Sequence, residues 1–313
     1  MQNSLFYGVP NHILNSPWEL VYFIHPFCDG NCKHCWSSDI ELGSLVNLEW
    51  HKSFTPKLRG LKIRELKISG GEPFLNKDIR AIIDYIREYL PVEIPITIFT
   101  SGRNFLSVKE NASGVDEIVN YLKSIINNFT NLSIHLSADE FHAETLYKHL
   151  YNVRNTELTE TEIKQSEQLM GIFVKNFISA CEKLKKENPN FNGGKLKIHC
   201  DIGRLQYHRN TIYNWMDDNS WSKYAIGTEG LIKTGNAKNI ENATEIVESD
   251  RWSFFVLPGV KIFETMQSNK SVKYYSKELN ENFYLDTEKN SGIIFAGWWN
   301  IINKTLCYKN ISL

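Results

Sequence analysis

Segments with the pattern of a buried strand alternate with amphipathic helical segments along the first 240 residues, and this alternation constrains the fold more than any other feature. Such alternation predicts a parallel sheet with right-handed crossovers. About six strand–helix units, rather than eight, predict an α/β fold with a partial (β/α)6 parallel barrel. Asn76 is expected to cap the second helix and Pro91 to end it. The predicted strands are 19–27, 64–69, 94–102, 131–139, 195–203 and 225–235, and the predicted helices are 47–58, 76–90, 113–129, 158–187 and 208–218.

The alternation fades after residue 240, which predicts a division of the chain into two parts. Residues 1–240 are expected to form the core barrel, and residues 241–313 a small, aromatic C-terminal cap. Trp298, Trp299 and Tyr308 would then close the mouth of the barrel. The alternative is that these rings form an ordinary hydrophobic plug.

Composition excludes several classes of protein. The formal net charge is −1, so no bulk attraction to nucleic acid or to a membrane surface is expected. The sequence has no apolar run of about 18 residues and no secretion signal at its start. Six cysteines in 313 residues do not make a disulfide framework. These features predict a cytoplasmic protein.

Three cysteines lie within the stretch FCDGNCKHCW, which directly follows the first predicted strand. Their spacing is C-x3-C-x2-C, at Cys28, Cys32 and Cys35. A structural zinc site needs a fourth protein ligand, which His34 or His25 could supply. An iron–sulfur cube held by three cysteines keeps its fourth iron open for a substrate or cofactor. The spacing alone leaves both metals as alternatives.

A second motif, SGGEP at residues 69–73, follows the second predicted strand about 35 residues later. Gly70 and Gly71 permit close backbone approach, and Glu72 supplies an anionic partner. Taken alone, GGEP is typical of an ordinary strand–helix turn.

Together, the cysteine loop and GGEP on consecutive strands resemble the signature of the radical S-adenosylmethionine (SAM) superfamily. The resemblance implies that Cys28, Cys32 and Cys35 hold a [4Fe–4S] cluster, whose fourth iron chelates the amino and carboxylate groups of SAM. It also implies that an electron from the cluster cleaves the sulfonium and releases a 5′-deoxyadenosyl radical. The expected fold is accordingly a partial barrel of the radical SAM type.

The same resemblance implies a set of SAM contacts. The backbone of His34 would contact the adenine, and the GGEP turn would bind the ammonium group. TGNAK, at residues 234–238, resembles the element that borders the adenine. The expected cofactor-binding residues are His34, Gly70, Gly71, Glu72, Pro73, Ser101, Ser137 and Asp139.

The period of two within strands sorts their side chains by face. In the strand 131–139, one face is apolar, while Ser133, His135, Ser137 and Asp139 share the other, which is expected to line the barrel. For His135 and for His199, a hydrogen-bonded core histidine is an equal alternative.

The segment LSADEFH and the GNAK turn resemble radical SAM enzymes that modify ribosomally made peptides, especially the epipeptide-type epimerases. Those enzymes usually carry an auxiliary cluster near the C-terminus, where this chain has Ala296 and Gly297 in place of the expected cysteines. An auxiliary cluster is therefore not expected. With 27 residues before Cys28, no leader-binding domain is expected there, so a separate protein or the tail would bind the leader.

Some members of the family use a cysteine to donate a hydrogen atom to a substrate radical. Cys200 and Cys181 fall on apolar faces and are expected to pack as core residues. Cys307 lies in a polar setting and is the candidate catalytic thiol, with an incidental surface thiol as the alternative.

The sequence therefore predicts a radical SAM enzyme that acts on a ribosomally synthesised peptide, with epimerisation as an example. The alternative is a small metabolite or nucleotide substrate, as in viperin-like or cofactor-biosynthesis relatives. A cluster-binding protein without turnover is a third possibility, and tRNA modification is not favoured by the charge. The expected electron donor is a flavodoxin or ferredoxin.

Overall fold

The computed structural model describes residues 18–25, 27–35, 48–59, 63–153, 157–200 and 225–230, together with five strands near the C-terminus. Those strands are β7 (Ser253–Val256), β8 (Lys273–Ser276), β9 (Glu281–Tyr284), β10 (Ile293–Asn300) and β11 (Thr305–Ile311). The expected helix 208–218 and the TGNAK turn lie outside the described residues. The side chains of His199, Cys200 and Cys307 also lie outside them.

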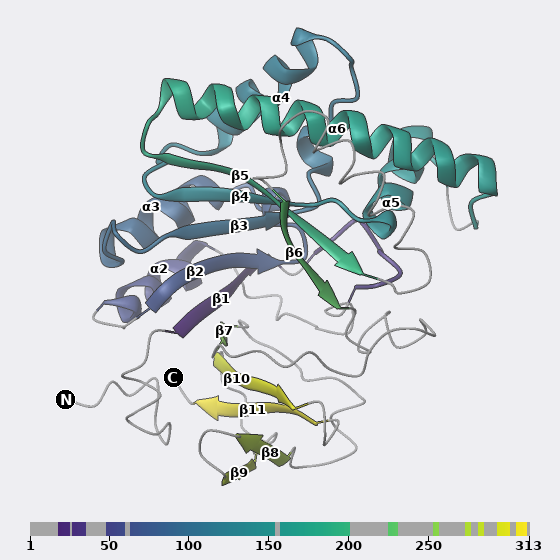
Figure 1. Cartoon of the computed structure of the whole chain (residues 1–313). Helices are drawn as coiled ribbons and strands as arrows, with labels where there is room; N and C mark the ends of the chain where they lie inside the picture. Colours follow the sequence, from purple (N-terminus) through teal and green to yellow (C-terminus); the bar gives the residue numbers. More distant parts are fainter. Residues whose placement is uncertain are drawn as a thin grey trace.

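Six parallel strands in chain order, from β1 to β6, form one continuous part of the sheet and reach its edge at β6 (Figure 1). Each pairs in parallel with the next, as the strand–helix alternation predicts. The predicted α/β partial barrel is therefore confirmed. The strands are β1 (Trp18–His25), β2 (Ile63–Gly70), β3 (Ile96–Thr100), β4 (Leu132–Ser137), β5 (Phe191–Cys200) and β6 (Ala225–Gly230).

The strands near the C-terminus continue the same sheet beyond β1. Strand β7 pairs in parallel with β1, β10 pairs antiparallel with β7, and β11 pairs antiparallel with β10. Strands β8 and β9 form a separate two-stranded sheet. The division of the chain at residue 240 stays a prediction.

The helices that connect the parallel strands follow their apolar periods. In α3, Ile79, Ile82, Ile83 and Ile86 are buried, and they lie on one face because they recur at helical spacing. Figure 1 shows α3, α4 and α6 on the same side of the sheet. The helices are α2 (Leu48–Phe54, continued by a 3-10 turn at Thr55–Leu58), α3 (Ile79–Tyr89), α4 (Ala112–Ile125), α5 (Glu140–Tyr151) and α6 (Glu160–Glu187).

One expectation about the helices was wrong, and one helix was not predicted. The residue that precedes α3 is Asp78, not Asn76. The Asn76 side chain instead accepts a hydrogen bond from the Asp78 backbone N–H and donates one to the carbonyl of Ile24, so it ties the turn to β1. Helix α5 was not predicted, although Asp139 caps it by accepting from the backbone N–H of His142.

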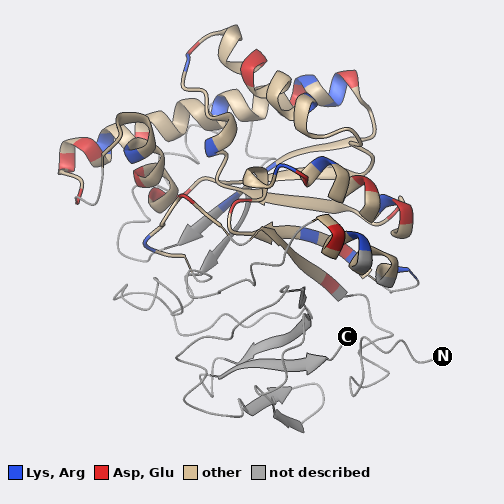
Figure 2. Ribbon diagram, turned by 180° about the vertical axis from the view of Figure 1, so that it is seen from behind, with Lys and Arg blue, Asp and Glu red and all other residues tan. Residues whose placement is uncertain are grey.

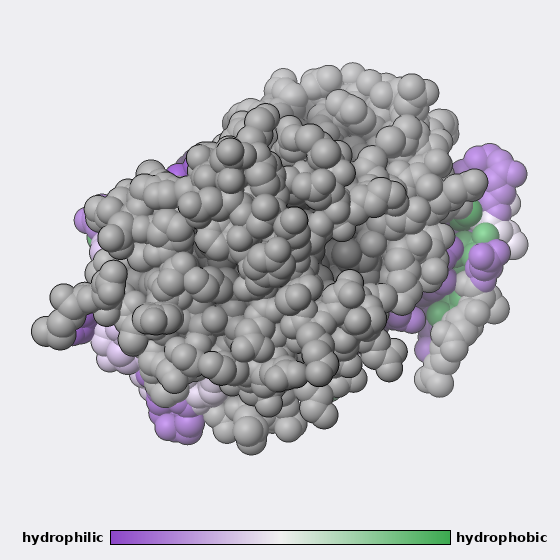
Figure 3. Space-filling model, turned by 90° about the horizontal axis from the view of Figure 1, so that it is seen from below, coloured by the Kyte–Doolittle hydropathy of each residue, from purple (hydrophilic) through white to green (hydrophobic). Residues whose placement is uncertain are grey.

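Charges of both signs are mixed over the outer surfaces of the described helices (Figure 2). Where described residues reach the face shown in Figure 3, hydrophilic side chains predominate beside a small hydrophobic group. The described surface thus presents no broad face of a single charge in the view of Figure 2. Among the described residues, no helix is long and apolar enough to cross a membrane.

A buried histidine that contacts Tyr22 of β1 makes the stability of the fold depend on pH in a predictable way. His51 in α2 is 0% exposed, and its Nδ1 lies 2.5 Å from the hydroxyl of Tyr22. Burial lowers the pKa of His51 to about 4, against about 6.5 in an unfolded chain. As pH falls below 6.5, the unfolded chain binds the proton first, so the folded state loses stability until pH reaches about 4.

We expect the His51→Asn variant, whose amide can still bond to Tyr22, to remove this dependence. Between pH 7 and pH 4, the free energy of unfolding of the parent should fall by about 3 kcal/mol more than that of the variant. Urea unfolding of the cluster-free protein at several pH values measures the difference. If the free energy of unfolding of the two proteins depends on pH in the same way, protonation of His51 does not cause the dependence.

Candidate functional site

The cysteine loop, residues 27–35, directly follows β1 and holds its thiols around a small space. If Gly30 had a side chain, its Cβ would lie 3.2 Å from the Cys28 sulfur and 3.3 Å from the Cys32 sulfur. The two sulfurs therefore face one common space, which the absence of a side chain at Gly30 keeps open. Cys35, which is half-buried, interacts electrostatically with both thiols. Two soft sulfur donors at one space, with a third cysteine in the same loop, suit iron–sulfur or zinc binding.

Contacts from two other parts of the fold hold this loop. The Thr145 hydroxyl of α5 donates to the Cys32 sulfur at 3.4 Å, and Glu144 pairs with Lys33 at 3.1 Å. After β3, the Arg103 guanidinium pairs with Asp29 at 3.0 Å. Burial raises the pKa of the Cys32 thiol, and nearby thiols and Asp139 raise it further. Binding of a metal at this thiol would therefore release a proton.

Of the two glycines of GGEP, Gly70 packs against the end of β1 and Gly71 against the start of the cysteine loop. The Gly71 N–H donates to the carbonyl of His25 at 2.8 Å, and the Glu72 N–H donates to the carbonyl of Phe27 at 2.9 Å. A Cβ at Gly71 would lie 2.0 Å from the Phe27 oxygen, and one at Gly70 would lie 2.5 Å from the His25 oxygen. The close approach that these glycines permit is thus an approach to the end of β1 and the start of the cysteine loop. Their contact with SAM stays a prediction.

The Glu72 carboxylate, 1% exposed, joins this turn to the end of β3. One oxygen accepts from the Thr100 hydroxyl at 2.7 Å and from the Phe74 N–H at 3.2 Å. The other accepts from the Ser101 N–H at 2.8 Å and from the Ser101 hydroxyl at 2.6 Å. These four bonds match the four acceptor positions of a carboxylate, so a direct bond from SAM would have to replace one of them. The structure thereby brings together Glu72 and Ser101, two of the predicted site residues.

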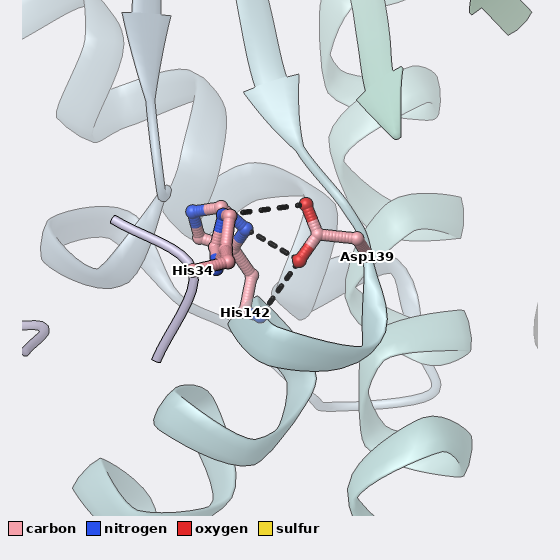
Figure 4. A group of neighbouring side chains, drawn as sticks. All are labelled: His34, Asp139 and His142. Atoms are coloured by element: carbon pink, nitrogen blue, oxygen red, sulfur yellow. Dashed lines mark hydrogen bonds and ion pairs between the residues drawn. The ribbon is translucent and has the colours of Figure 1, made fainter. Parts of the chain in front are cut away.

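Two further predicted residues, His34 and Asp139, meet at the start of α5 (Figure 4). Asp139 is fully buried, and its Oδ1 accepts from the His142 backbone N–H at 3.0 Å and lies 2.8 Å from the ring Nδ1 of His142. The His34 Nε2 lies 3.9 Å from Oδ2 of Asp139. The His34 ring stacks on Phe141 with centroids 4.6 Å apart. The ring of His34, which belongs to the cysteine loop, therefore faces α5.

Of the remaining predicted site residues, all except Cys307 have side chains in the described part of the chain. Pro73 begins a buried 3-10 turn, and Ser137 is buried at the end of β4. The ring of His135 is buried against Phe99, with Nε2 3.2 Å from the carbonyl of Leu196, which favours the core alternative. Cys181 is buried as expected, whereas Cys307 is placed only by the backbone of β11.

The sequence profile described as the Radical SAM superfamily matches residues 22–191, which is more than half of the chain. The chain belongs to the radical SAM superfamily. Members of this superfamily use a [4Fe–4S] cluster and SAM, so the family favours the iron–sulfur alternative over zinc for the three cysteines. The Cys28 and Cys32 sulfurs beside Gly30, with Cys35 in the same loop, fit the donor set of such a cluster.

Solved structures of radical SAM proteins resemble this chain at low identity. Native anSMEcpe with bound AdoMet and Cp18Cys peptide has 13% identity and a TM-score of 0.39, covering 73% of this chain and 55% of that one. SuiB from Streptococcus suis, bound to the precursor peptide SuiA, has 15% identity and a TM-score of 0.39, covering 78% and 58%. The radical SAM chain described here thus spans less than two thirds of the length of these proteins. No curated protein sequence matches it.

Sequence reasoning missed three contributors to this radical SAM site: Arg103, Thr145 and His142. The first two reach the cysteine loop from positions far away in sequence. His142 had a usable signal, because an Asp before a helix favours capping and brings a residue three positions later close to its carboxylate.

Proposed function

We propose that this chain cleaves SAM reductively and uses the resulting radical to abstract a hydrogen atom from a ribosomally synthesised peptide. The observation that carries the proposal is the cysteine loop, in which the Cys28 and Cys32 sulfurs face one space beside Gly30. Backbone hydrogen bonds join the start of this loop and the end of β1 to the GGEP turn. When bound, the cluster supplies the electron that breaks a carbon–sulfur bond of SAM. The protein orients the substrate hydrogen and excludes water.

The predicted site residues have the following proposed roles in binding the cluster and SAM. Cys28, Cys32 and Cys35 hold the cluster. Glu72 fixes the position of Ser101 through its two hydrogen bonds, so that Ser101 can face SAM. The other proposed SAM contacts are His34, Gly70, Gly71, Pro73, Ser137 and Asp139.

A peptide is the proposed substrate because LSADEFH and GNAK resemble segments of peptide-modifying members. The expected lack of an auxiliary cluster favours hydrogen abstraction over oxidative crosslinking. Residues 241–313 are proposed to cap the barrel, and a separate protein is proposed to bind the leader peptide. A small metabolite or nucleotide, as in viperin-like relatives, remains the second candidate, and a flavodoxin or ferredoxin the proposed electron donor.

Anaerobic incubation tests the two parts of this proposal separately. The reduced, reconstituted protein should release 5′-deoxyadenosine from SAM even without a peptide. A colourless protein that binds stoichiometric zinc and releases no 5′-deoxyadenosine would overturn the proposed cleavage of SAM. With candidate peptides in deuterated water, mass spectrometry should find one deuterium at an α-carbon of the product. Modification of a nucleotide instead would support the second candidate.

The proposed hydrogen donor can be tested by the Cys307→Ala variant. We expect the variant to retain SAM cleavage but to lose at least about 100-fold in epimerised peptide, the order of magnitude known for the loss of a general acid or base. The measurement compares 5′-deoxyadenosine with deuterated product in the same reaction. Unchanged product formation would remove Cys307 from the mechanism.

A further inference from the structure

A compact group of nitrogen and oxygen donors lies beside the cysteine loop. His34 comes from the loop, while Asp139 and His142 come from the start of α5 (Figure 4). One ligand atom from each residue lies within 4.8 Å of the other two. His34 and Asp139 are buried, and His142 is half-buried.

The donor set has the chemistry of a transition-metal site. Two imidazoles and one carboxylate are ligands that Zn²⁺ and Fe²⁺ favour. Metal–ligand bonds of about 2.0–2.2 Å place the ligand atoms roughly 3–3.5 Å apart, so a small contraction of the observed group would suffice. Three protein ligands also leave a coordination position for water or for a group of a substrate.

Contacts within the protein hold the three side chains in place. The backbone N–H of His142 fixes Asp139 as the cap of α5, and Phe141 stacks on the ring of His34. The pair Lys33–Glu144 ties the residue before His34 to the same helix. The donors therefore come from two segments whose relative position is fixed.

We propose that His34, Asp139 and His142 form a mononuclear site for a divalent transition metal such as Zn²⁺ or Fe²⁺, separate from the three cysteines. The proposal goes beyond the proposed function, since a cation can bind here whether or not SAM is cleaved. It assigns the carboxylate of Asp139 to the cation in place of the predicted contact with SAM. The backbone contact predicted for His34 is compatible with it.

Zinc alone, added to the full chain carrying its reconstituted cluster, tests the site. After competition with a chelator, we expect one retained Zn²⁺ per chain with the iron content unchanged. X-ray absorption at the zinc edge should show nitrogen and oxygen neighbours at about 2.0–2.1 Å. Sulfur neighbours at about 2.3 Å, or no retained zinc, would overturn the proposal.

Matched variants then assign the ligands. His142→Gln should weaken zinc binding by more than about 100-fold, which exceeds the effect of losing an outer-shell partner. His149→Gln, on the exposed end of the same helix, should bind zinc like the parent. Asp139→Asn keeps a good helix cap, so weak binding in this variant reports the lost ligand even if His142→Gln disturbs the fold. Parent-like affinity in Asp139→Asn or in a folded His142→Gln would overturn the proposal.

Discussion

Replacing Cys32 by alanine is expected to abolish cluster binding and to reduce 5′-deoxyadenosine release to that of a protein-free control. The Cys32 thiol is buried, is held by Thr145, and faces the same space as the Cys28 sulfur. The proposed cluster has three protein ligands. Loss of the Cys32 thiol would leave two of them and expose a further iron. Iron and sulfide content after anaerobic reconstitution, together with deoxyadenosine release, measures the effect.

Cys181→Ala is the matched control, because it removes another buried thiol from the same chain. Cys181 lies in α6 against β5, where its sulfur would be 2.7 Å from a Cβ at Gly194. Its loss should lower the free energy of unfolding by about 1–2 kcal/mol through a small cavity. Iron content should stay at the parent level. Equal iron loss in both variants would mean that the Cys32 effect reflects folding, and a full cluster in Cys32→Ala would contradict its role as a ligand.

The barrel was predictable because its sequence signals are local and strong. Helix α3 shows isoleucines at helical spacing, and the strand–helix order alone fixes a parallel sheet. Helix α5 was missed for a physical reason. Its buried face mixes apolar residues with Glu144 and Thr145, which contact the cysteine loop, so the apolar period in the sequence is weak.

The candidate site was predictable only in its local motifs. Cysteine spacing and GGEP each lie within one short segment, so the sequence shows them directly. The contacts that position those motifs join residues far apart in sequence, such as Thr145 and Cys32, which are 113 residues apart. Helix and strand periods carry no information on such pairs. The role of Glu72 as an acceptor for Ser101, 29 residues away, was out of reach for the same reason.

Replacing Gly71 by alanine is expected to destabilise the cysteine loop severely. The new Cβ would lie 2.0 Å from the Phe27 oxygen, 2.3 Å from the Phe27 carbonyl carbon and 2.8 Å from the Cys28 nitrogen. All three are backbone atoms, which no side-chain rotation can move away. The loop must shift, breaking the hydrogen bonds from Gly71 to His25 and from Glu72 to Phe27. We expect a loss of about 3 kcal/mol or more in the free energy of unfolding, together with loss of the cluster.

The same substitution at Gly171 separates this clash from the general effect of adding a methyl group. Gly171 lies inside α6, and a Cβ there meets no atom within 4 Å. Because alanine has the higher helix propensity, Gly171→Ala should raise the free energy of unfolding by about 0.5–1 kcal/mol. In urea unfolding, the free energy of unfolding should therefore fall in Gly71→Ala and rise in Gly171→Ala. The iron content should be lost only in Gly71→Ala. If Gly71→Ala reconstitutes a full cluster, the cysteine loop does not depend on close packing against GGEP, and the glycines would have to be explained by contact with SAM alone.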